Sequence, residues 1–394
     1  MSAPAALTRR RMLAGLASGA TALALPRRPL AQAADDRVLI LVKLAGGNDG
    51  LNTLVPYADP AYRRARPQIG LTAADVLDLG DGLGLHPGLA GLEDAWAAGD
   101  LAVVRGVGYA PADRSHFRSM DVWETGGTPA APLPTGWLAR TLPAALGPRR
   151  PLDLLVIGAD PMVNVAGGNV TAYALSAGAT LPRSVPAANV ASAAPANPAL
   201  GHILEVQRRL AAAQSGLAEA LSTLPTLATP FPDDDFGRRL ALAARLVAGG
   251  APVRAILVPL AGFDTHAGQR AVHDALLSAL GNGLAALRAA LVEAGRWRAT
   301  TVATYSEFGR RLAENGSGGT DHGTAAPHLV LGGAVAGGWH GVQPSLADLV
   351  DRDPLPTTDF RAYLASLAVA GLGLAPADAT EALGAAPLAL RTPA

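Results

Sequence analysis

The sequence of 394 residues predicts an α/β fold with a doubly wound, mostly parallel sheet that carries helices on both faces. The first observation behind this prediction is a set of short, continuous apolar runs, which are typical of strands buried on both faces. The second is that segments with helical periodicity separate most of these runs, because strands that alternate with helices form parallel sheets. In such a sheet, ligands bind at the edge formed by the carboxyl ends of the strands.

The predicted elements follow one another along the chain. Continuous aliphatic and β-branched runs predict strands over residues 37–44, 101–104, 154–158, 254–260, 300–305 and 328–331. The helical spacing of apolar residues predicts helices over 89–98, 202–221, 236–248, 269–294 and 360–370. Residues 174–198 are rich in Ala, Pro, Ser and Asn and predict an irregular insertion. We therefore expect residues 34–394 to form a single α/β domain with one insertion.

Residues 1–33 have the features of a twin-arginine signal peptide. Arg9 and Arg10 precede an apolar run over 12–25, which is shorter than the roughly 20 residues that a membrane span needs. Ala31-Gln32-Ala33 is a small-x-small cleavage site. We expect export of the folded protein through the twin-arginine translocase and a periplasmic or secreted location.

Composition excludes several classes of function. The chain has a formal net charge of zero and no basic block after the signal, so nucleic acid is not an expected partner. It has no cysteine, which excludes disulfides, thiolate metal ligands and cysteine nucleophiles. No later apolar run predicts an integral membrane span. Motifs for phosphate-binding loops, dinucleotides and hydrolase nucleophile elbows are also absent.

Polar side chains follow three of the predicted strands at the carboxyl edge of the sheet. Asp49 follows the first strand, Asp264 and His266 follow the fourth, and Asp321 and His322 lie in the turn-rich segment after the fifth. Three carboxylates and two imidazoles could hold one or two divalent ions. Carboxylates favour calcium or magnesium, and the imidazoles extend the range to zinc or manganese. The sequence therefore predicts a divalent metal site.

Each of these residues also has a structural alternative. Asp49 lies in Asn-Asp-Gly, a sequence typical of an Asx turn. Asp264 could cap the helix predicted over 269–294. Asp321 and His322 could be hydrogen-bonded within their loop. His328 and His340 are two further candidates for a late metal ligand.

A fourth polar cluster follows the predicted strand 101–104. Ser115 is a candidate nucleophile, activated by a metal or by a base, and His116 is the adjacent candidate base. Adjacent side chains in an extended segment point in opposite directions, which argues against direct contact between them. Arg118 and Arg310 are candidates for binding an anionic group. The alternative is a solvated surface loop.

The chain resembles the exported bacterial family called domain of unknown function 1501. The motifs that carry the resemblance extend over nearly the whole mature chain and are specific in combination: Gly46-Gly47-Asn48-Asp49-Gly50-Leu51-Asn52, Arg114-Ser115-His116-Phe117, Trp123-Glu124-Thr125-Gly126, Phe263-Asp264-Thr265-His266, Ser306-Glu307-Phe308-Gly309-Arg310 and Gly319-Thr320-Asp321-His322-Gly323. That family is grouped with the alkaline phosphatase and sulfatase-like superfamily. The resemblance implies an alkaline-phosphatase-like fold with one or two metal ions at the carboxyl edge.

The resemblance also implies roles for individual residues. Asp49 looks like the first-strand metal aspartate of the superfamily, and Asp321-His322 resembles its Asp-His metal pair. Asp264 and His266 resemble its Asp…His pair, with a shorter spacing. The sulfatase signature Cys/Ser-x-Pro-x-Arg is absent, and Ser115 corresponds to the nucleophile only by its order in the chain.

These observations predict a periplasmic, metal-dependent hydrolase of phosphate or sulfate esters. Its substrate would be a small anionic ester or a glycan. The absent nucleophile signature leaves a second hypothesis open, a non-catalytic member of the fold that binds a metal, a glycan or a surface protein. A structural role without metal is a third.

Overall fold

The computed structural model describes residues 36–131, 133–145, 150–176 and 197–392. Its central sheet contains β1 (Val38–Ala45), β5 (Leu101–Gly108), β6 (Leu152–Ile157), β7 (Ala172–Leu175), β8 (Val253–Ala261), β9 (Thr300–Tyr305), β12 (Ala326–Leu331), β13 (Gly338–His340) and β16 (Thr358–Asp359). Smaller sheets are formed by β2 (Leu54–Val55), β3 (Leu77–Asp78) and β4 (Gly84–Leu85), by β10 (Arg310–Glu314) and β11 (Thr320–His322), and by β14 (Leu349–Val350) and β15 (Asp353–Pro354).

The helices alternate with these strands along most of the chain. They are α2 (Gly50–Thr53), α3 (Pro60–Ala65), α4 (Glu93–Ala97), α5 (His116–Thr125), α6 (Trp137–Thr141), α7 (Pro198–Ser222), α8 (Asp235–Ala248), α9 (Gln269–Glu293), α10 (Phe360–Leu367) and α11 (Pro376–Leu383). Short 3₁₀ turns cover Pro87–Leu92, Leu142–Ala144, Val163–Val165 and Trp297–Ala299, and a π turn over Ala368–Leu372 extends α10.

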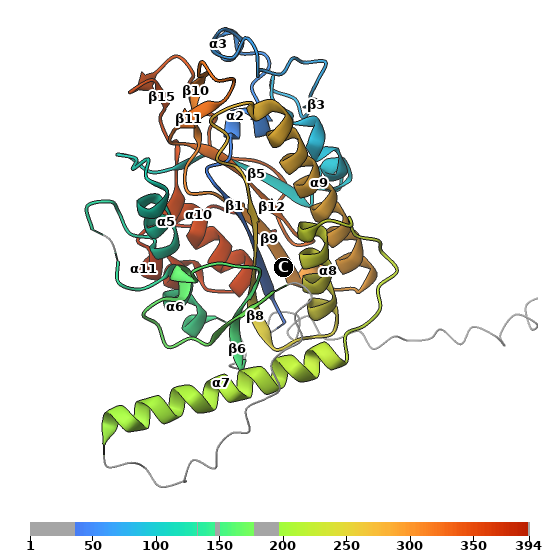
Figure 1. Cartoon of the computed structure of the whole chain (residues 1–394), viewed down its shortest axis with the longest axis vertical. Coiled ribbons are helices and arrows are strands. Elements are labelled where there is room, and N and C mark those ends of the chain that lie inside the picture. The colour runs from blue at the N-terminus through green and yellow to red at the C-terminus, as the bar shows by residue number, and fades with distance from the viewer. Residues whose placement is uncertain (1–35, 132, 146–149, 177–196, 393–394) are drawn as a thin grey trace, which may run out of the picture.

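The central sheet is mostly parallel. Its strand order is β13-β5-β12-β9-β1-β8-β6-β7, with β16 also paired to β5. Every pairing is parallel except those of β12, which is antiparallel to both β5 and β9. The carboxyl ends of the other strands therefore share one edge of the sheet, at the top of Figure 1.

Helices cover both faces of the sheet, as the continuous apolar strands require. In β1, Ile40 and Val42 face a core that includes α8 and α9. Leu39 and Leu41 face the opposite core, which includes α5, α6, α10 and α11. Figure 1 shows these two groups of helices on opposite sides of the strands. The predicted fold class, a doubly wound and mostly parallel α/β sheet, is confirmed.

Helix α9 is long and apolar enough to cross a membrane, by length and composition alone. Leu277, Leu280, Leu284 and Leu287 of this helix are buried in the core beside the sheet. A core helix of a large α/β protein passes the same test, and this packing accounts for its apolar composition.

Most predicted elements coincide with observed ones, and the differences lie at the edges of the fold. Strand β12 runs antiparallel, and the turn-rich segment after β9 contains the hairpin β10–β11, neither of which the apolar pattern indicates. Of the predicted insertion over 174–198, the first two residues belong to β7, and residues 177–196 lie outside the described part of the chain. The signal peptide predicted over 1–33 also lies outside it.

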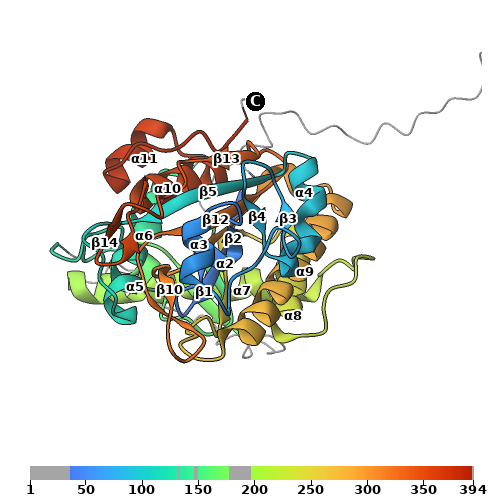
Figure 2. The ribbon, with the colours of Figure 1, turned by 90° about the horizontal axis from the view of Figure 1, so that it is seen from above.

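The carboxyl edge of the sheet is covered by short elements from distant parts of the chain. Helices α2 and α3 follow β1, and the hairpin β10–β11 follows β9. Figure 2 shows these elements grouped over the strand ends when the molecule is seen from above. Of the candidate functional residues, Asp321 and His322 lie in this hairpin, whereas His116 begins α5 and Asp264 and His266 lie in the loop after β8.

Candidate metal centre

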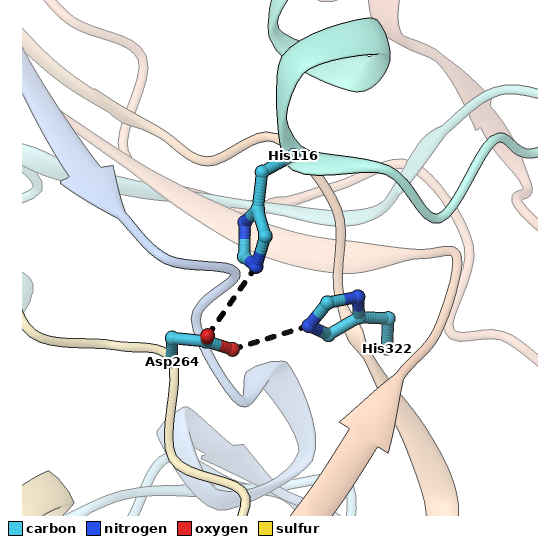
Figure 3. A group of neighbouring side chains, drawn as sticks. All are labelled: His116, Asp264 and His322. Carbon is cyan, nitrogen blue, oxygen red and sulfur yellow. Dashed lines mark hydrogen bonds and ion pairs between the residues drawn. The ribbon is translucent and has the colours of Figure 1, made fainter.

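Three side chains from separate segments converge at the carboxyl edge of the sheet. His116 is the first residue of α5, Asp264 lies in the loop after β8, and His322 ends β11. One nitrogen or oxygen atom of each lies within 4.8 Å of the others. The His116 Nε2 atom is 3.4 Å from Asp264 Oδ2, and His322 Nε2 is 3.1 Å from Asp264 Oδ1. Figure 3 shows both imidazoles pointing at the carboxylate.

His266 extends this group by a fourth side chain. Its Nε2 atom is 3.1 Å from Asp264 Oδ1 and 2.9 Å from His322 Nε2. Its Nδ1 atom faces Asp321 Oδ1 at 3.5 Å. The carboxylate of Asp321 is about half exposed and accepts a hydrogen bond from Asn315. Asp321 therefore lies beside His266, outside the group of three.

Hydrogen bonds on the far side of two imidazoles fix their orientation. His116 Nδ1 lies 3.0 Å from Glu307 Oε1, and His322 Nδ1 lies 2.8 Å from the carbonyl oxygen of Arg114. Both Nε2 atoms are thereby directed at Asp264. Carboxylate or carbonyl partners on the other ring nitrogen are the usual arrangement around histidines that bind a metal.

The two imidazoles differ in proton affinity. The hydrogen bond with Glu307 raises the pKa of His116, and the charge of that carboxylate adds to the effect. Burial lowers the pKa of His322, although its bond to the Arg114 carbonyl opposes this. Because imidazole binds metals in its neutral form, metal binding at His116 would compete with protonation of the ring.

Arg310 connects three loops beneath Asp264. Its side chain is fully buried and donates to the carbonyl oxygens of Gly46, Gly47, Phe263 and Thr320, as well as to Asp264 Oδ1 at 2.8 Å. Burial would raise the pKa of Asp264, but the hydrogen bonds from Arg310 and His322 and the charge of Arg310 lower it to about 2. The structure thus supplies Asp264 as an anion. The predicted role of Arg310 in binding a substrate anion does not fit its burial.

Two glycines allow the loops to approach each other closely. A Cβ atom on Gly46, which has φ +119°, would lie 2.4 Å from the backbone nitrogen of Asp264. A Cβ on Gly319 would lie 2.3 Å from the carbonyl carbon of His266. Both positions require glycine, because a side chain would separate the loops that carry the candidate ligands.

Asp49, predicted as a ligand, is directed elsewhere. Its side chain is fully buried, and Arg66 Nη1 donates to Oδ2 at 2.6 Å. Gln269 donates to the same oxygen, and the Leu51 backbone N–H donates to Oδ1 at 3.2 Å. The residue caps α2, so the predicted Asx-type geometry fits it better than metal binding. We leave Asp49 out of the proposed ligand set.

The predicted catalytic residues also take different places. Ser115 is exposed at the N-cap of α5, and its side chain makes no capping hydrogen bond. Its neighbour His116 turns to Asp264 and Glu307. Arg118 Nη2 donates to the carbonyl oxygen of Pro129 at 3.1 Å, which places its guanidinium against the loop after α5.

The two late histidines do not join the group. His328 is fully buried, with its ring stacked on Tyr363 and edge-on to Trp123. Burial lowers its pKa to about 3. His340 Nε2 lies 2.7 Å from the carbonyl oxygen of Ala336. Neither residue is a candidate ligand in this structure.

Sequence reasoning missed the ligand position of His116 and the supporting role of Glu307. The sequence suggested His116 only as a candidate base for Ser115, with their opposite directions arguing against it, and nothing in the local sequence indicated its contact with Asp264. Glu307 directly follows Ser306 at the end of β9, the same signal that identified Asp49 and Asp264. It also accepts a hydrogen bond from the Gly46 N–H at 2.8 Å. A carboxylate that follows a central strand can therefore orient a ligand rather than be one.

The donor atoms fit a divalent cation. Three imidazole nitrogens and one carboxylate converge, a set that suits zinc or manganese better than calcium or magnesium. His322 Nδ1 points at a carbonyl oxygen and so carries the proton, which leaves a lone pair on its Nε2 atom. In the neutral ring that lone pair faces the Asp264 carboxylate, so a cation can take the place of the proton that the charged ring donates to Asp264.

The model of one protein family, described as protein of unknown function (DUF1501), matches residues 187–383, which is half of the chain. The chain belongs to this family. The expected family membership is thus confirmed. Within the DUF1501 match lie Asp264, His266 and His322, whereas His116 precedes it.

Solved structures that resemble this DUF1501 chain include ester hydrolases. Phosphonate monoester hydrolase SpPMH from Silicibacter pomeroyi is 12% identical, with a TM-score of 0.40 and coverage of 90% of this chain and 78% of the hydrolase. PsFucS1 sulfatase from Pseudoalteromonas sp. is 12% identical, with a TM-score of 0.37 and coverage of 86% and 73%. The periplasmic domain of EcEptC from Escherichia coli, in complex with Zn, is 10% identical, with a TM-score of 0.37 and coverage of 75% and 72%. No curated protein matches the DUF1501 sequence.

Proposed function

We propose that this protein is an exported, metal-dependent hydrolase of phosphate or sulfate esters. The observation that carries the proposal is the convergence of His116, Asp264 and His322 at the carboxyl edge of the sheet, with ligand atoms within 4.8 Å of one another. His266 is the fourth candidate ligand. This edge is where open α/β sheets bind their substrates.

In this proposal the residues divide into metal ligands and residues that hold the ligands in position. The imidazoles and Asp264 would hold one divalent ion, zinc or manganese by donor type. Such an ion polarises the ester and stabilises the leaving oxygen. Glu307 and the Arg114 carbonyl keep the imidazole Nε2 atoms directed inward, and Arg310 keeps Asp264 charged and in place.

We assign the binding of the ester's anionic oxygens to Arg114. Its backbone carbonyl already contacts His322, so the residue borders the ligand group. Its guanidinium is 30% exposed, and Nη2 pairs with Asp353 at 2.6 Å. The buried Asp353 fixes one end of the guanidinium, and Nε is also buried, so only the exposed part of the group is left for an anion.

A second candidate function, a non-catalytic metal-binding protein, is favoured by one observation. The hydroxyl of Ser115, the candidate nucleophile, makes no capping hydrogen bond, and the adjacent His116 faces Asp264 instead of it. A nucleophilic serine normally has an activating base within hydrogen-bond reach. In the hydrolase proposal, either a metal activates Ser115 or water attacks the ester directly.

Asp264→Asn is expected to remove the metal and the hydrolysis of phosphate or sulfate esters together, with a decrease of at least 100-fold in kcat/KM. The amide keeps the shape of the side chain but loses the charge. Elemental analysis of protein isolated from the periplasm of its own host measures the metal, and an ester panel measures turnover. Ser115→Ala in the same assay separates attack by serine from attack by water.

Three outcomes contradict the proposal in different ways. Wild-type protein without a stoichiometric divalent metal excludes the metal site. Metal without turnover of any ester favours the non-catalytic alternative. Absence from the periplasm contradicts the export expected from residues 1–33.

Arg114→Lys is expected to raise KM for the ester about 10-fold with no change in bound metal, because a lysine keeps the charge opposite Asp353 but loses the planar fork. Steady-state kinetics together with metal analysis measure both effects. Arg118→Lys is the matched control, since Arg118 is bonded to the Pro129 carbonyl. An unchanged KM in Arg114→Lys would assign anion binding to another residue.

A further inference from the structure

A cavity of about 520 Å³ lies at the carboxyl end of β5. Its volume falls within the range of small-molecule binding sites. The wall is formed by three segments, residues 108–111 at the end of β5, 127–130 after α5 and 356–361 at β16 and the start of α10. Strand β16 runs parallel to β5 with Asp359 opposite Gly108, so the cavity belongs to the same edge of the sheet as the candidate metal centre.

The wall offers an apolar surface and few unused polar groups. Prolines and alanines from three loops form much of it. The polar side chains have partners within the protein: Thr357 and Thr358 donate to the carbonyl oxygens of Val342 and Arg105, Thr128 accepts from the Ala131 N–H, and the Tyr109 hydroxyl is bonded to Ser119. A ligand here would be held mainly by apolar contact.

The charged groups of the wall neutralise each other. Arg361 Nη2 lies 2.6 Å from Asp359 Oδ2, and its Nε atom lies 3.1 Å from Oδ1. Asp359 also caps α10 by accepting from the Arg361 backbone N–H at 2.8 Å. An anionic ligand would meet this carboxylate at the helix terminus, so the wall favours an uncharged group.

The segments on either side of α5 line the cavity, and the first residue of α5, His116, belongs to the candidate metal centre. Four residues lie between Pro111 in the cavity wall and His116, so their Cα atoms are at most about 18 Å apart. On the same helix, Arg118 Nη2 donates to the carbonyl oxygen of Pro129 in the wall. One elongated molecule could therefore contact both places along the edge of the sheet.

We propose that this cavity binds an uncharged, apolar organic group. Its assignment as the alcohol part of the ester rests on the proposed function. The substrate would then be an ester of a bulky, largely apolar alcohol, with the anionic group at the metal centre and the organic group against the loops of α5 and α10.

The test uses 2-naphthol, a neutral aromatic probe, with the full-length mature protein. Titration calorimetry on metal-free wild type is expected to show one site. Ala130→Trp places an indole in the cavity and is expected to weaken binding at least 10-fold. Ala131→Trp, the adjacent exposed position outside the wall, is expected to stay within 2-fold. Ala130→Leu replaces Ala130→Trp if the tryptophan lowers the melting temperature.

The outcomes separate the cavity from the hydrolase proposal. The cavity site is overturned if wild type does not bind 2-naphthol. It is also overturned if wild type, Ala130→Trp and Ala130→Leu all bind 2-naphthol equally well. If the binding pattern holds, 2-naphthyl phosphate or sulfate should show about a 10-fold higher KM in Ala130→Trp, with the KM of the methyl ester unchanged. Binding with the expected pattern but no hydrolysis of any ester supports the cavity and contradicts the proposed function.

Discussion

Replacement of Arg310 by methionine is expected to lower the free energy of unfolding by about 3–5 kcal/mol and to weaken metal binding. The side chain is fully buried and donates to four backbone carbonyl oxygens and to Asp264. Methionine fills a similar volume but donates no hydrogen bond. The carbonyl oxygens of Gly46, Gly47, Phe263 and Thr320 would then lose this donor. They belong to the loops after β1 and β8 and to β11, which meet at Arg310.

Metal affinity should fall because Asp264 loses its fixed partner. Without Arg310, the pKa of Asp264 rises from about 2 toward its ordinary value, and the carboxylate is free to rotate. Urea denaturation measures the stability, and competition with a metal-sensitive dye measures the affinity. Arg64→Met is the control, with an expected change below about 0.5 kcal/mol because Arg64 is exposed. If the free energy of unfolding of Arg310→Met is within about 1 kcal/mol of wild type and its metal affinity is unchanged, the loops keep their arrangement without Arg310.

The sequence predicted the fold because apolar runs report burial directly. β1, β8 and β9 are continuous aliphatic or β-branched segments, and only a sheet covered on both faces buries them. The antiparallel direction of β12 was not predictable, since an apolar run is the same in either direction. The direction of β12 is set by its pairing with β5 and β9, both of which run in the opposite direction.

The location of the candidate site was predictable from the sequence, but the residues that form it were less so. Asp264 and His266 follow β8, and His322 lies in the segment after β9, so the common edge of the sheet brings them together. Asp49 follows a strand as well, but it forms a buried ion pair with Arg66 at the end of α3 and is therefore not available to a metal. His116 follows a long loop after β5, so its approach to Asp264 depends on a helix position that local sequence does not specify. Which carboxylate receives an arginine partner is decided by tertiary contacts.

Asp49 and Asp264 offer the sharpest contrast between a structural and a ligand carboxylate. Both follow central strands and both contact an arginine. The Asp49–Arg66 pair is fully buried on both sides, whereas Asp264 is 47% exposed beside three imidazoles. An ion can approach Asp264, but Asp49 is enclosed by its own partners. Substitution should therefore separate stability from metal binding.

Asp49→Asn is expected to lower the free energy of unfolding by about 3–5 kcal/mol, because it leaves Arg66 buried without a counter-charge. Metal stoichiometry should remain that of wild type at temperatures where the variant is folded. Asp264→Asn should show the reverse, with metal lost and a smaller decrease in the stability of the metal-free protein, about 1–2 kcal/mol, because the buried Arg310 keeps its four carbonyl acceptors. Urea denaturation of metal-free proteins and elemental analysis of folded ones measure the four values.

A double-mutant cycle tests the physical reason. If the cost of Asp49→Asn arises from the unpaired Arg66, then Arg66→Met in the same chain should recover part of it, because a buried pair can be replaced by apolar side chains at lower cost than the loss of one partner. Additive losses would instead point to the hydrogen bonds that Asp49 accepts from Gln269 and the Leu51 N–H. Loss of metal in Asp49→Asn with unchanged stability would instead show that Asp49 is a metal ligand. The ion pair between Asp49 and Arg66 would then have to break when metal binds.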